Sequence, residues 1–310
     1  MTNNGNDKGA KKKFVYYPGC SSQGSSKHLD ESLRAVVPAL GLEMEEIDDW
    51  NCCGASVGNI GGGPLPTTAL SGRNLAKAEE QQATDVITGC AACYLNTHGA
   101  NERIKADIAL RGKVNESLSA ADMSYEANLQ VRHACEVIVN DVGIEKIKER
   151  VTSPLEGLKV AGYVGCQTVR PFANTESGGN YDSFDDPEFL DQFTEACGAE
   201  AVDYDVKTSC CGGSVSVISP EKTLHLIKEI LQAAEDAGAD VISTPCPLCQ
   251  TNVEMYQPAI NKKFGTNFNI PVVFYSQLMA KAFGLDGKKD AGLHRNTIRS
   301  EKLDILVKNS

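Results

Sequence analysis

The feature that most constrains this 310-residue chain is the order of its cysteines, because ten of the twelve fall into two copies of one pattern. Each copy has a single cysteine after a glycine, then an adjacent pair followed by glycine, then a CxxC pair. The first copy consists of Cys20, Cys52, Cys53, Cys90 and Cys93, and the second of Cys166, Cys210, Cys211, Cys246 and Cys249. Repetition of this kind indicates that the chain is a duplicated unit.

The spacing of the cysteines supports the duplication. Between the adjacent pair and the CxxC pair lie 36 residues in the first copy and 34 in the second. The preceding gap is 31 residues in the first copy and 43 in the second. We place the additional residues of the longer gap in 173–189. The Gly, Asn, Asp and Pro content of this segment is typical of a surface loop, either a lid or an insertion.

The hydrophobic pattern places the motifs at equivalent points of two α/β units. Short β-rich runs, FVYY and KVAGYV, lead into the single cysteines, and the apolar runs DVIT and DVIS lead into the CxxC pairs. Helices are predicted before the latter runs, over 71–83 and 219–238, the second with Ser219 as N-cap and Pro220 in its first turn. Residues 124–143 also have a helical pattern and are expected to pack between or against the two units.

The order strand, helix, strand predicts parallel βαβ units. The CxxC pairs should then lie just past the carboxyl ends of strands, where open α/β sheets bind their ligands. We therefore predict an α/β protein made of two duplicated Rossmann-like domains, residues 14–150 and 151–310, related by a pseudo-two-fold axis with a cleft between them. Residues 1–13 are polar and lysine-rich, and we expect a disordered tail there.

Charge and composition narrow the class of partner. The formal net charge of -11 argues against nucleic acid and anionic membrane surfaces, because both attract basic patches. No apolar run reaches a membrane-spanning length and no signal peptide is visible, so we expect a cytoplasmic protein. In a reducing compartment, twelve cysteines are more often metal ligands or catalysts than disulfides.

The arrangement of the cysteines favours one kind of metal centre over others. Two CxxC pairs could bind one zinc ion, and a lone CxxC at a strand end could be thioredoxin-like. Both alternatives leave the other ordered cysteines unexplained. An iron-sulfur cluster presents several irons that each bind a soft thiolate, and the glycine after each adjacent pair would let the backbone approach such a bulky group. Iron-sulfur clusters are therefore the favoured interpretation.

The two sets of Cys, CCG and CxxC resemble the cysteine-rich CCG domain found in the B-subunit family of heterodisulfide reductase. The similarity covers nearly the whole chain from residue 14 and includes YYPGC, WNCCGA, GCAACY, YVGCQTVRP, CCGG and CPLCQTN. It implies that the five cysteines of each copy bind a noncubane 4Fe-4S cluster, so that the chain holds two. The longer gap before Cys210 and the CCG of the first pair make the chain more similar to proteins of bacterial sulfur metabolism than to the methanogen enzyme.

The resemblance also implies an activity. Breaking a disulfide takes two electrons, whereas a cluster normally passes one, so two clusters facing a substrate could each supply one. The implied protein is an oxidoreductase subunit that cleaves or forms the sulfur-sulfur bond of a thiol/disulfide substrate, for example one bound to a lipoate protein. The chain has no CxxCxxCxxxCP run, so a ferredoxin-like C subunit and a flavoprotein A subunit are the expected partners.

Two other classes of function stay open at this point. The chain could be an electron-transfer or anchoring subunit of a quinone-linked dehydrogenase of the succinate or glycolate type, because related domains occur there. It could also be a metal-dependent scaffold without turnover. Iron and sulfide analysis with spectra recorded before and after adding thiol would separate the three.

A few residues outside the motifs carry weaker signals. We predict that Cys135 and Cys197 pack in the core as small apolar residues. His133 and Arg170 are candidates to supply a proton or to hold a substrate carboxylate, beside ordinary helix and surface roles. Residues 58–66 are glycine-rich but lack the Lys-Ser/Thr of a phosphate loop, so they predict a flexible turn beside the first site and no nucleotide.

Overall fold

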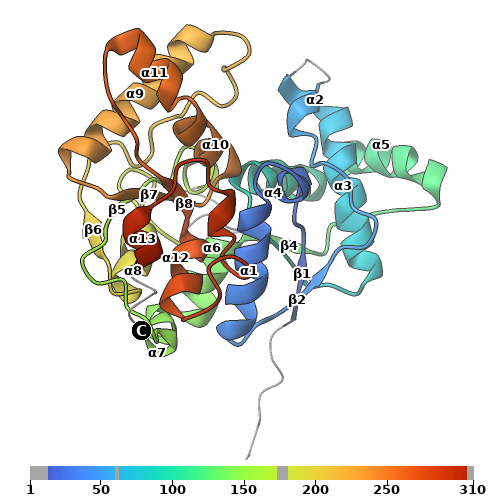
Figure 1. Ribbon diagram of the computed structural model, residues 1–310. Helices are drawn as coiled ribbons and strands as arrows, with labels where there is room; N and C mark the ends of the chain where they lie inside the picture. The colour runs from blue at the N-terminus through green and yellow to red at the C-terminus, as the bar shows by residue number, and fades with distance from the viewer. Residues whose placement is uncertain (1–12, 60–62, 173–180, 306–310) are drawn as a thin grey trace, which may run out of the picture.

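Two parallel sheets form the framework of the molecule (Figure 1). The computed structural model describes residues 13–59, 63–172 and 181–305. Within these ranges the strand order is β2-β1-β3-β4 in the first sheet and β6-β5-β7-β8 in the second, so one topology occurs twice. All neighbouring strands are parallel. The predicted α/β class and the duplication are confirmed.

The strands are short, with three or four residues each. The first sheet contains β1 (Lys13–Tyr16), β2 (Glu43–Glu46), β3 (Asp85–Thr88) and β4 (Gln130–His133). The second contains β5 (Lys159–Gly162), β6 (Glu200–Val202), β7 (Val241–Thr244) and β8 (Val272–Phe274). Strands β3 and β7 are buried along their whole length, as expected for parallel strands covered on both faces.

The start of the chain is described only from Lys13 onward. Lys13 is the first residue of β1 and pairs with Glu43 of β2, so it belongs to the sheet and not to the predicted tail. Residues 1–12, where the rest of that tail is predicted, lie outside the described residues.

Helices connect the strands in the same order in both halves. In the first half these are α1 (Lys27–Ala39), α2 (Ala55–Asn59), α3 (Pro64–Glu80), α4 (Ala91–Ala106), α5 (Ile108–Leu118), α6 (Ala134–Val137) and α7 (Ile144–Arg150), with a π-helical turn at Ile138–Val142. In the second half they are α8 (Phe189–Ala196), α9 (Pro220–Asp236), α10 (Pro247–Met255), α11 (Gln257–Phe264), α12 (Tyr275–Ala282) and α13 (Glu301–Ile305). Short 3-10 turns occur at Cys20–Gln23, Ser119–Ala121, Arg170–Phe172 and Leu293–Arg295.

The helix predicted over 219–238 is confirmed almost to the residue. Ser219 is the N-cap of α9 and Pro220 its first residue. Ile227, Ile230 and Leu231 are fully buried, as a stripe of apolar residues at helical spacing predicts.

Helix α3 starts earlier than predicted. Pro64 and Pro66 form its first turn, where the fixed backbone of proline suits a helix start. The turn expected over 58–66 is therefore wrong at this end, and also at its start, where residues 58 and 59 belong to α2. Residues 60–62 of that segment lie outside the described residues.

The helix predicted over 124–143 is wrong in its first half. From Met123 to Val131 every second residue is buried and the residues between are exposed, which is the pattern of an extended chain rather than a helix. This segment continues into strand β4, and helical structure begins only at Ala134. The sequence of this segment does alternate between apolar and polar residues, as a strand does. Its alanine and glutamate also suit a helix, which is why a helix is predicted there.

A shared core joins the two halves. Helix α12 of the second half packs against α1 of the first, and α7 of the first half packs against α8 of the second (Figure 1). Both contacts belong to one cluster of buried apolar residues, which also contains Cys135 and Cys197. The reciprocal exchange of helices is what a pseudo-two-fold relation between the halves produces. We propose that the boundary between the two halves lies between residues 150 and 151, after α7 and before β5.

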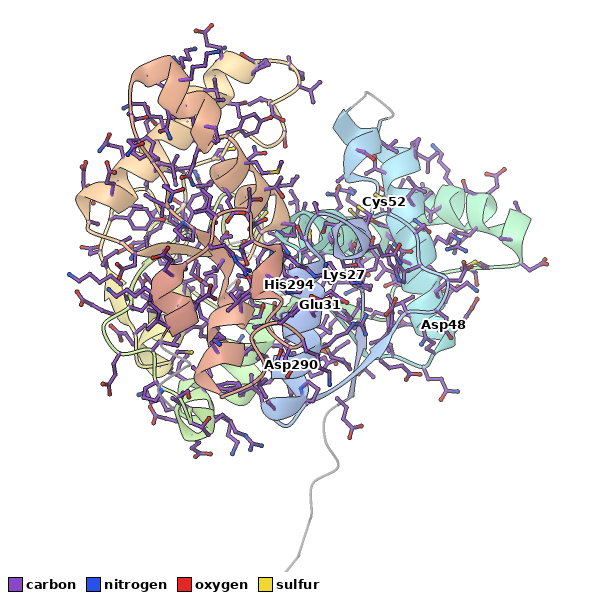
Figure 2. All side chains as sticks on the ribbon, in the orientation of Figure 1. Lys27, Glu31, Asp48, Cys52, Asp290 and His294 are labelled. Atoms are coloured by element: carbon purple, nitrogen blue, oxygen red, sulfur yellow. The ribbon has the colours of Figure 1, made fainter. Side chains whose placement is uncertain are left out.

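Polar contacts at the edge of this core tie the last segment of the chain to α1. The Arg295 guanidinium makes two hydrogen bonds to the Glu31 carboxylate, at 2.8 and 2.9 Å, and Figure 2 shows Glu31 on α1 close to His294. Deeper in the interface, Ser32 Oγ and Ser276 Oγ are 2.6 Å apart. These bonds fix the register between α1 and the second half.

His28 lies in the same interface and has no polar partner for its ring among the described residues. Both ring nitrogens are buried without a hydrogen bond, and the ring centroid lies 4.8 Å from that of Phe274. Burial lowers the pKa of His28 to about 4. The folded protein therefore holds this imidazole neutral at the junction of its two halves.

We expect this histidine to make the protein sensitive to acid. Below about pH 6.5 the unfolded chain binds a proton at His28, which the folded chain resists until about pH 4, so stability falls as the pH falls through this range. At pH 4.5 the loss of stability from this group is about 2–3 kcal/mol. Urea unfolding of the wild type and of His28→Leu between pH 7 and 4.5 measures it. Equal pH slopes in the two proteins would contradict the assignment.

Candidate functional site

The cysteine loops of each half meet at one edge of its sheet. Cys20 follows β1, the pair Cys52 and Cys53 follows β2, and the pair Cys90 and Cys93 follows β3. The second half repeats this with Cys166 after β5, Cys210 and Cys211 after β6, and Cys246 and Cys249 after β7. The carboxyl ends of parallel strands share an edge, so three separate loops converge there. The predicted position of the CxxC pairs past strand ends is confirmed.

In the first half the five thiols form one connected group. The thiol of Cys53 shares hydrogen bonds with those of Cys52 and Cys93, and the Cys93 thiol also shares a hydrogen bond with Cys90. The bond with Cys53 raises the pKa of Cys52, and Cys20 lies near enough to add to this effect. The same bonds lower the pKa of Cys53, and the bond with Cys93 lowers the pKa of Cys90, so both favour the thiolate form. All five line one cavity of about 300 Å³.

The five thiols of the second half are connected in a similar way. Cys211 shares a hydrogen bond with Cys249, and Cys249 with Cys246, which repeats the chain of contacts made by the equivalent thiols of the first half. Cys166 and Cys210 form a separate pair beside them. These five line a second cavity of only about 20 Å³.

Each CxxC pair begins a helix, which suits a thiolate. Cys90 is the N-cap of α4 and its Sγ accepts the Cys93 N–H at 3.4 Å, while Cys246 is the N-cap of α10. In both halves a threonine two residues earlier accepts the N–H of the first cysteine, Thr88 for Cys90 and Thr244 for Cys246, each at 3.4 Å. The partial positive charge of a helix N-terminus stabilises negative sulfur.

The glycine before the first cysteine of each set has no space for a side chain. A Cβ on Gly19 would lie 2.5 Å from Cys93 Sγ, and one on Gly165 would lie 2.8 Å from Cys249 Sγ. Both glycines also have left-handed backbones, with φ of +77° and +72°. The chain therefore passes directly over the last sulfur of each CxxC pair, and only glycine allows this approach.

The glycine after each adjacent pair has a different role from the one expected. A Cβ on Gly54 would lie 3.1 Å from Thr67 Cγ2, and one on Gly212 would lie 2.9 Å from Thr223 Oγ1. The close neighbour is thus the first turn of α3 or α9 and not the thiol set. These glycines allow the CCG loop to pack against the following helix. The expectation that they let the backbone approach a bulky group at the thiols is corrected.

Two buried tyrosines link the cysteine loops in an equivalent manner. Tyr17 Oη donates to the Asn51 carbonyl at 2.8 Å, and Tyr163 Oη donates to the Ser209 carbonyl at 2.6 Å. Each tyrosine stands three residues before the first cysteine, and each acceptor stands immediately before the adjacent pair. Burial raises the pKa of both phenols, so they stay protonated and act as donors.

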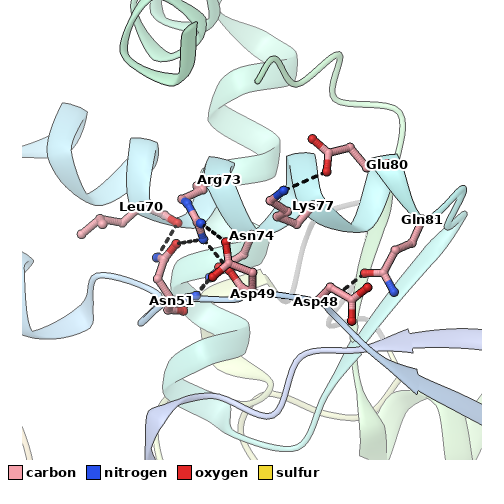
Figure 3. A network of polar contacts seen from close by, with 9 residues as sticks. All are labelled: Asp48, Asp49, Asn51, Leu70, Arg73, Asn74, Lys77, Glu80 and Gln81. Carbon is pink, nitrogen blue, oxygen red and sulfur yellow. Dashed lines mark hydrogen bonds and ion pairs between the residues drawn. The ribbon is translucent and has the colours of Figure 1, made fainter. Parts of the chain in front are cut away.

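Around Asn51 the first site is held by a network of polar contacts with α3 (Figure 3). The Asn51 N–H donates to Asn74 Oδ1 at 2.8 Å, and Asn74 Nδ2 donates back to the Asn51 carbonyl at 2.8 Å. Arg73 donates to Asn51 Oδ1 at 3.1 Å and pairs with the Asp49 carboxylate. The loop that carries Cys52 and Cys53 is thereby fixed by the protein's own contacts.

In the second half, a buried lysine, Lys207, holds the loop that leads to Cys210. Lys207 Nζ lies 2.9 Å from both Asp186 and Asp191, and the Lys207 carbonyl accepts the N–H groups of Val164 and Gly165 at 2.9 Å. Burial works against the charge of Lys207, but the two carboxylates outweigh it and raise its pKa, so the ammonium stays charged. One residue thus ties the strand end before Cys166 to α8.

Arg170 and His133 differ in their relation to the thiols. The hydrogen bond from Cys166 lowers the pKa of Cys210 most, and the positive charge of Arg170 adds to this, so Arg170 lies beside the second set. His133 is fully buried, with its Nδ1 accepting the Cys135 N–H at 3.2 Å. Burial lowers the pKa of His133 to about 3, which keeps it neutral and fits a packing role better than proton supply.

The two cysteines outside the sets pack as predicted. Cys135 and Cys197 are buried in the core shared by the two halves, and burial raises the pKa of both thiols. Of the loop predicted at 173–189, residues 173–180 lie outside the described residues.

Sequence reasoning missed two pairs of residues that shape the sites. One pair is Tyr17 and Tyr163, and the other is Gly19 and Gly165, whose lack of a Cβ the sulfur atoms require. Both halves share the pattern Tyr-x-Gly-Cys, which is the sequence signal that could have revealed them.

Two further observations concern metals and membranes. Within 13–59, 63–172 and 181–305, no three His, Cys, Asp or Glu side chains are grouped so as to hold a single metal ion. The thiols instead form extended chains of sulfur contacts. In the same ranges no helix has the length and apolar character needed to cross a membrane.

Comparison with known proteins gives full-length relatives. The chain is 32% identical to a protein of Archaeoglobus profundus that is named as similar to the heterodisulfide reductase B subunit, over 96% of this chain and 99% of the relative. It is 30% identical to the B subunit of the ferredoxin:CoB-CoM heterodisulfide reductase of Methanosarcina mazei, over 96% of both chains. It is 32% identical to the 8-methylmenaquinol:fumarate reductase membrane anchor subunit of Wolinella succinogenes, over 94% of this chain and 99% of the relative.

Structural and domain comparisons agree with this. A crystal structure of a hypothetical protein from Helicobacter pylori shares the fold, with a TM-score of 0.71 at 17% identity, over 94% of this chain and 53% of that one. Residues 14–97 and 160–254 each match the cysteine-rich domain named CCG, so the match contains both adjacent cysteine pairs and both CxxC pairs. The chain therefore belongs to the CCG cysteine-rich family and resembles the heterodisulfide reductase B subunit over nearly its whole length.

Proposed function

We propose that this protein is the iron-sulfur subunit of a heterodisulfide reductase-type complex in sulfur metabolism, where it cleaves or forms the sulfur-sulfur bond of a thiol/disulfide substrate. The observation that carries the proposal is the pair of five-thiol sets, placed by equivalent loops of two equivalent sheets. The cavities beside the two sets share Gly213, Ser214 and Leu248 as wall residues, so the sets face a common space.

The residues of each set fit an iron-sulfur cluster. Each set offers five soft thiols as ligands, and the helix N-terminus at each CxxC pair offers favourable charge. Gly19 and Gly165 let the backbone pass close to the last sulfur of each set. We propose that one 4Fe-4S cluster binds to Cys20, Cys52, Cys53, Cys90 and Cys93 and another to Cys166, Cys210, Cys211, Cys246 and Cys249. Five ligands per cluster support a noncubane form. Such clusters, when bound, supply or accept single electrons.

The chain's own residues would position the substrate and keep water away from it. The first cavity is lined by both halves, with Cys20 and Ala92 on one side and Pro247, Leu248 and Thr251 on the other. A disulfide held there lies between the two thiol sets. Arg170, beside Cys210, would stabilise a product thiolate at the second set through its permanent charge.

A ferredoxin-like C subunit, a flavoprotein A subunit and a cytoplasmic location complete the proposal. The relatives from Archaeoglobus and Methanosarcina carry the name of heterodisulfide reductase subunits, which supports assembly within such a complex. A thiol bound to a lipoate protein remains our proposed form of the substrate.

A second candidate function rests on the Wolinella relative, whose name assigns it to a menaquinol:fumarate reductase. On this alternative the chain would transfer electrons or anchor a quinone-linked dehydrogenase, and no substrate sulfur would meet the clusters. Response to thiols separates the two functions, because only the first requires a sulfur compound to bind at the cavity.

We expect anaerobically purified protein to contain about eight irons and eight sulfides per chain, as two four-iron clusters require. Added thiol should change its EPR spectrum, and a reduced dye should drive disulfide reduction. Chemical analysis, EPR and a dye-oxidation assay measure these three quantities. Zinc in place of iron would overturn the cluster assignment, whereas intact clusters with thiol-insensitive spectra would favour the electron-transfer alternative.

Gly19→Ala and Gly165→Ala should each remove one cluster. The new methyl group meets the Cys93 or Cys249 sulfur at less than 3 Å, so the iron content should fall from about eight to about four per chain. Gly143→Ala and Gly238→Ala are matched controls, since both glycines have left-handed φ values, +83° and +73°, but no atom of the described residues lies within 4 Å of the added Cβ. Full iron content in the first two variants would contradict the geometry.

Tyr17→Phe should alter the first cluster with little loss of overall stability. Removing its bond to the Asn51 carbonyl costs about 1 kcal/mol and loosens the loop of Cys52 and Cys53, so the midpoint potential of one cluster should shift. Tyr125→Phe is the control, because its phenol donates to Asn101 Oδ1 at 2.6 Å away from the thiols. EPR-monitored redox titration compares them, and equal midpoints in wild type, Tyr17→Phe and Tyr125→Phe would exclude the role.

A further inference from the structure

The two cavities are unequal, and one side chain explains much of the difference. Leu248, the third residue of the second CxxC motif, takes the position that Ala92 holds in the first. Leu248 lines both cavities and is 40% exposed. The cavity at the first set measures about 300 Å³ and the one at the second about 20 Å³. Leu248 therefore fills space beside the second set that Ala92 leaves open beside the first.

Among the described residues, the walls of both cavities carry no Asp, Glu, Lys, Arg or His side chain. Besides its five thiols, the first cavity is lined by four serines, Thr251, Gly213 and the apolar residues Ala55, Ala92, Pro247 and Leu248. The second adds Gln167 as its amide-bearing residue. Hydroxyl and amide groups can hydrogen-bond an uncharged ligand, but they offer no counter-ion to a carboxylate, sulfonate or ammonium group.

Exposed aliphatic residues occur on the segments that carry two of the wall residues, Ser214 and Leu248. Val215 follows the wall residue Ser214, and Val217 and Ile218 come next, exposed at 91% and 79%. Met255, one of the exposed apolar residues of α10, is 60% exposed at the other end of the helix that carries Leu248. The loop that carries the wall residue Ser214 thus also presents exposed aliphatic side chains to solvent.

Two charged residues, Arg170 and Lys27, lie outside the cavity walls. Arg170 is exposed and turned toward the Thr208 carbonyl, to which its Nη1 donates at 3.4 Å. Lys27 is exposed, and Figure 2 labels it at the start of α1. Neither residue lines the first or the second cavity. Arg170 thus acts on Cys210 through its charge, and neither cation contributes an atom to the cavity walls.

Transfer of a charged group from water into such a site is unfavourable, because nothing in the described walls replaces its hydration. An uncharged aliphatic group loses little hydration and gains contact with Leu248 and its neighbours. Granted the proposed function, we infer that the part of the substrate that enters between the two thiol sets is uncharged and aliphatic. Leu248 is the specificity-determining residue, because it alone projects a side chain of this size into the walls of both cavities as described.

The test uses the cluster-loaded full chain and three small disulfides that differ mainly in charge. These are hydroxyethyl disulfide, which is neutral, dithiodipropionate, which is anionic, and cystamine, which is cationic. Initial rates with a reduced viologen dye as electron donor give kcat/KM for each disulfide. Each value is divided by the rate constant for reaction of the same disulfide with a free thiol, which corrects for its intrinsic reactivity. We expect the neutral compound to exceed both charged ones by about ten-fold or more.

A binding measurement gives the same ranking without turnover. Mercaptoethanol, mercaptopropionate and cysteamine are the matching thiols, and each is titrated while the visible and EPR spectra of the clusters are recorded. The apparent Kd should be about ten-fold lower for the neutral thiol. A lower Kd for either charged thiol, or equal values for all three, would overturn the inference.

Variants at Leu248 connect the ranking to this residue. Leu248→Lys introduces a counter-charge at an exposed position that tolerates it, and should raise the relative kcat/KM for dithiodipropionate by about ten-fold. Leu248→Ala removes the side chain without adding charge and should keep the neutral compound first. An unchanged ranking in Leu248→Lys would remove Leu248 from its assigned role.

The outcomes separate this inference from the function on which it rests. If no disulfide is reduced and no thiol alters the spectra, the proposed function fails and the inference fails with it. If disulfides are reduced but charged ones are preferred or equal, the function stands and the uncharged substrate is excluded. Only a neutral preference that Leu248→Lys shifts toward the anion supports both.

Discussion

In a parallel sheet every strand ends at the same edge, and the chemistry of this protein depends on that constraint. Three neighbouring strands, β2, β1 and β3, each continue into a loop that carries cysteine, so sulfur atoms far apart in sequence meet within one cavity. The chain leaves β1 toward one edge for β2 and then crosses back to β3, which makes the gap between β1 and β3 the switch point where such sheets bind ligands. Cys20 and Cys90 follow the strands on either side of it.

A second constraint is the shared core between the halves. A half on its own would leave α1 or α8 without the helix that covers it, because α12 and α7 come from the other half. Ser32 and Ser276 meet across this boundary at 2.6 Å. The relative position of the two thiol sets is thus fixed by packing rather than by a flexible linker, which is what a substrate shared between them needs. Duplication alone would give two sites, and this interlocking brings them to one space.

The sequence allowed the main features of the site to be predicted because cysteine order and short apolar runs are local signals. Features that depend on contacts between distant residues could not be predicted in this way. The extended chain over 123–131 contains residues with good helical propensity, and it leads into pairing with β3 that begins only at Gln130. The roles of Tyr17 and Gly19 depend on contacts with residues in other loops, so no window around either residue reveals them. The difference between Ala92 and Leu248 is readable in the sequence but acquires meaning only beside two cavities.

The electrostatics of the site follow from the same arrangement. The described cavity walls hold no side chain with a permanent charge, so negative sulfur is balanced mainly by backbone N–H groups and by the N-termini of α4 and α10. Fixed dipoles of this kind stabilise charge without attracting competing ions, and they do not move when a ligand enters. The second set has Arg170 beside Cys210 and the smaller cavity, whereas the first has the larger cavity and a Cys53 whose pKa is lowered by neighbouring thiols instead. Two sites of common origin therefore differ in the space that they offer a ligand, and in the second a guanidinium adds to the neighbouring thiols that favour a thiolate.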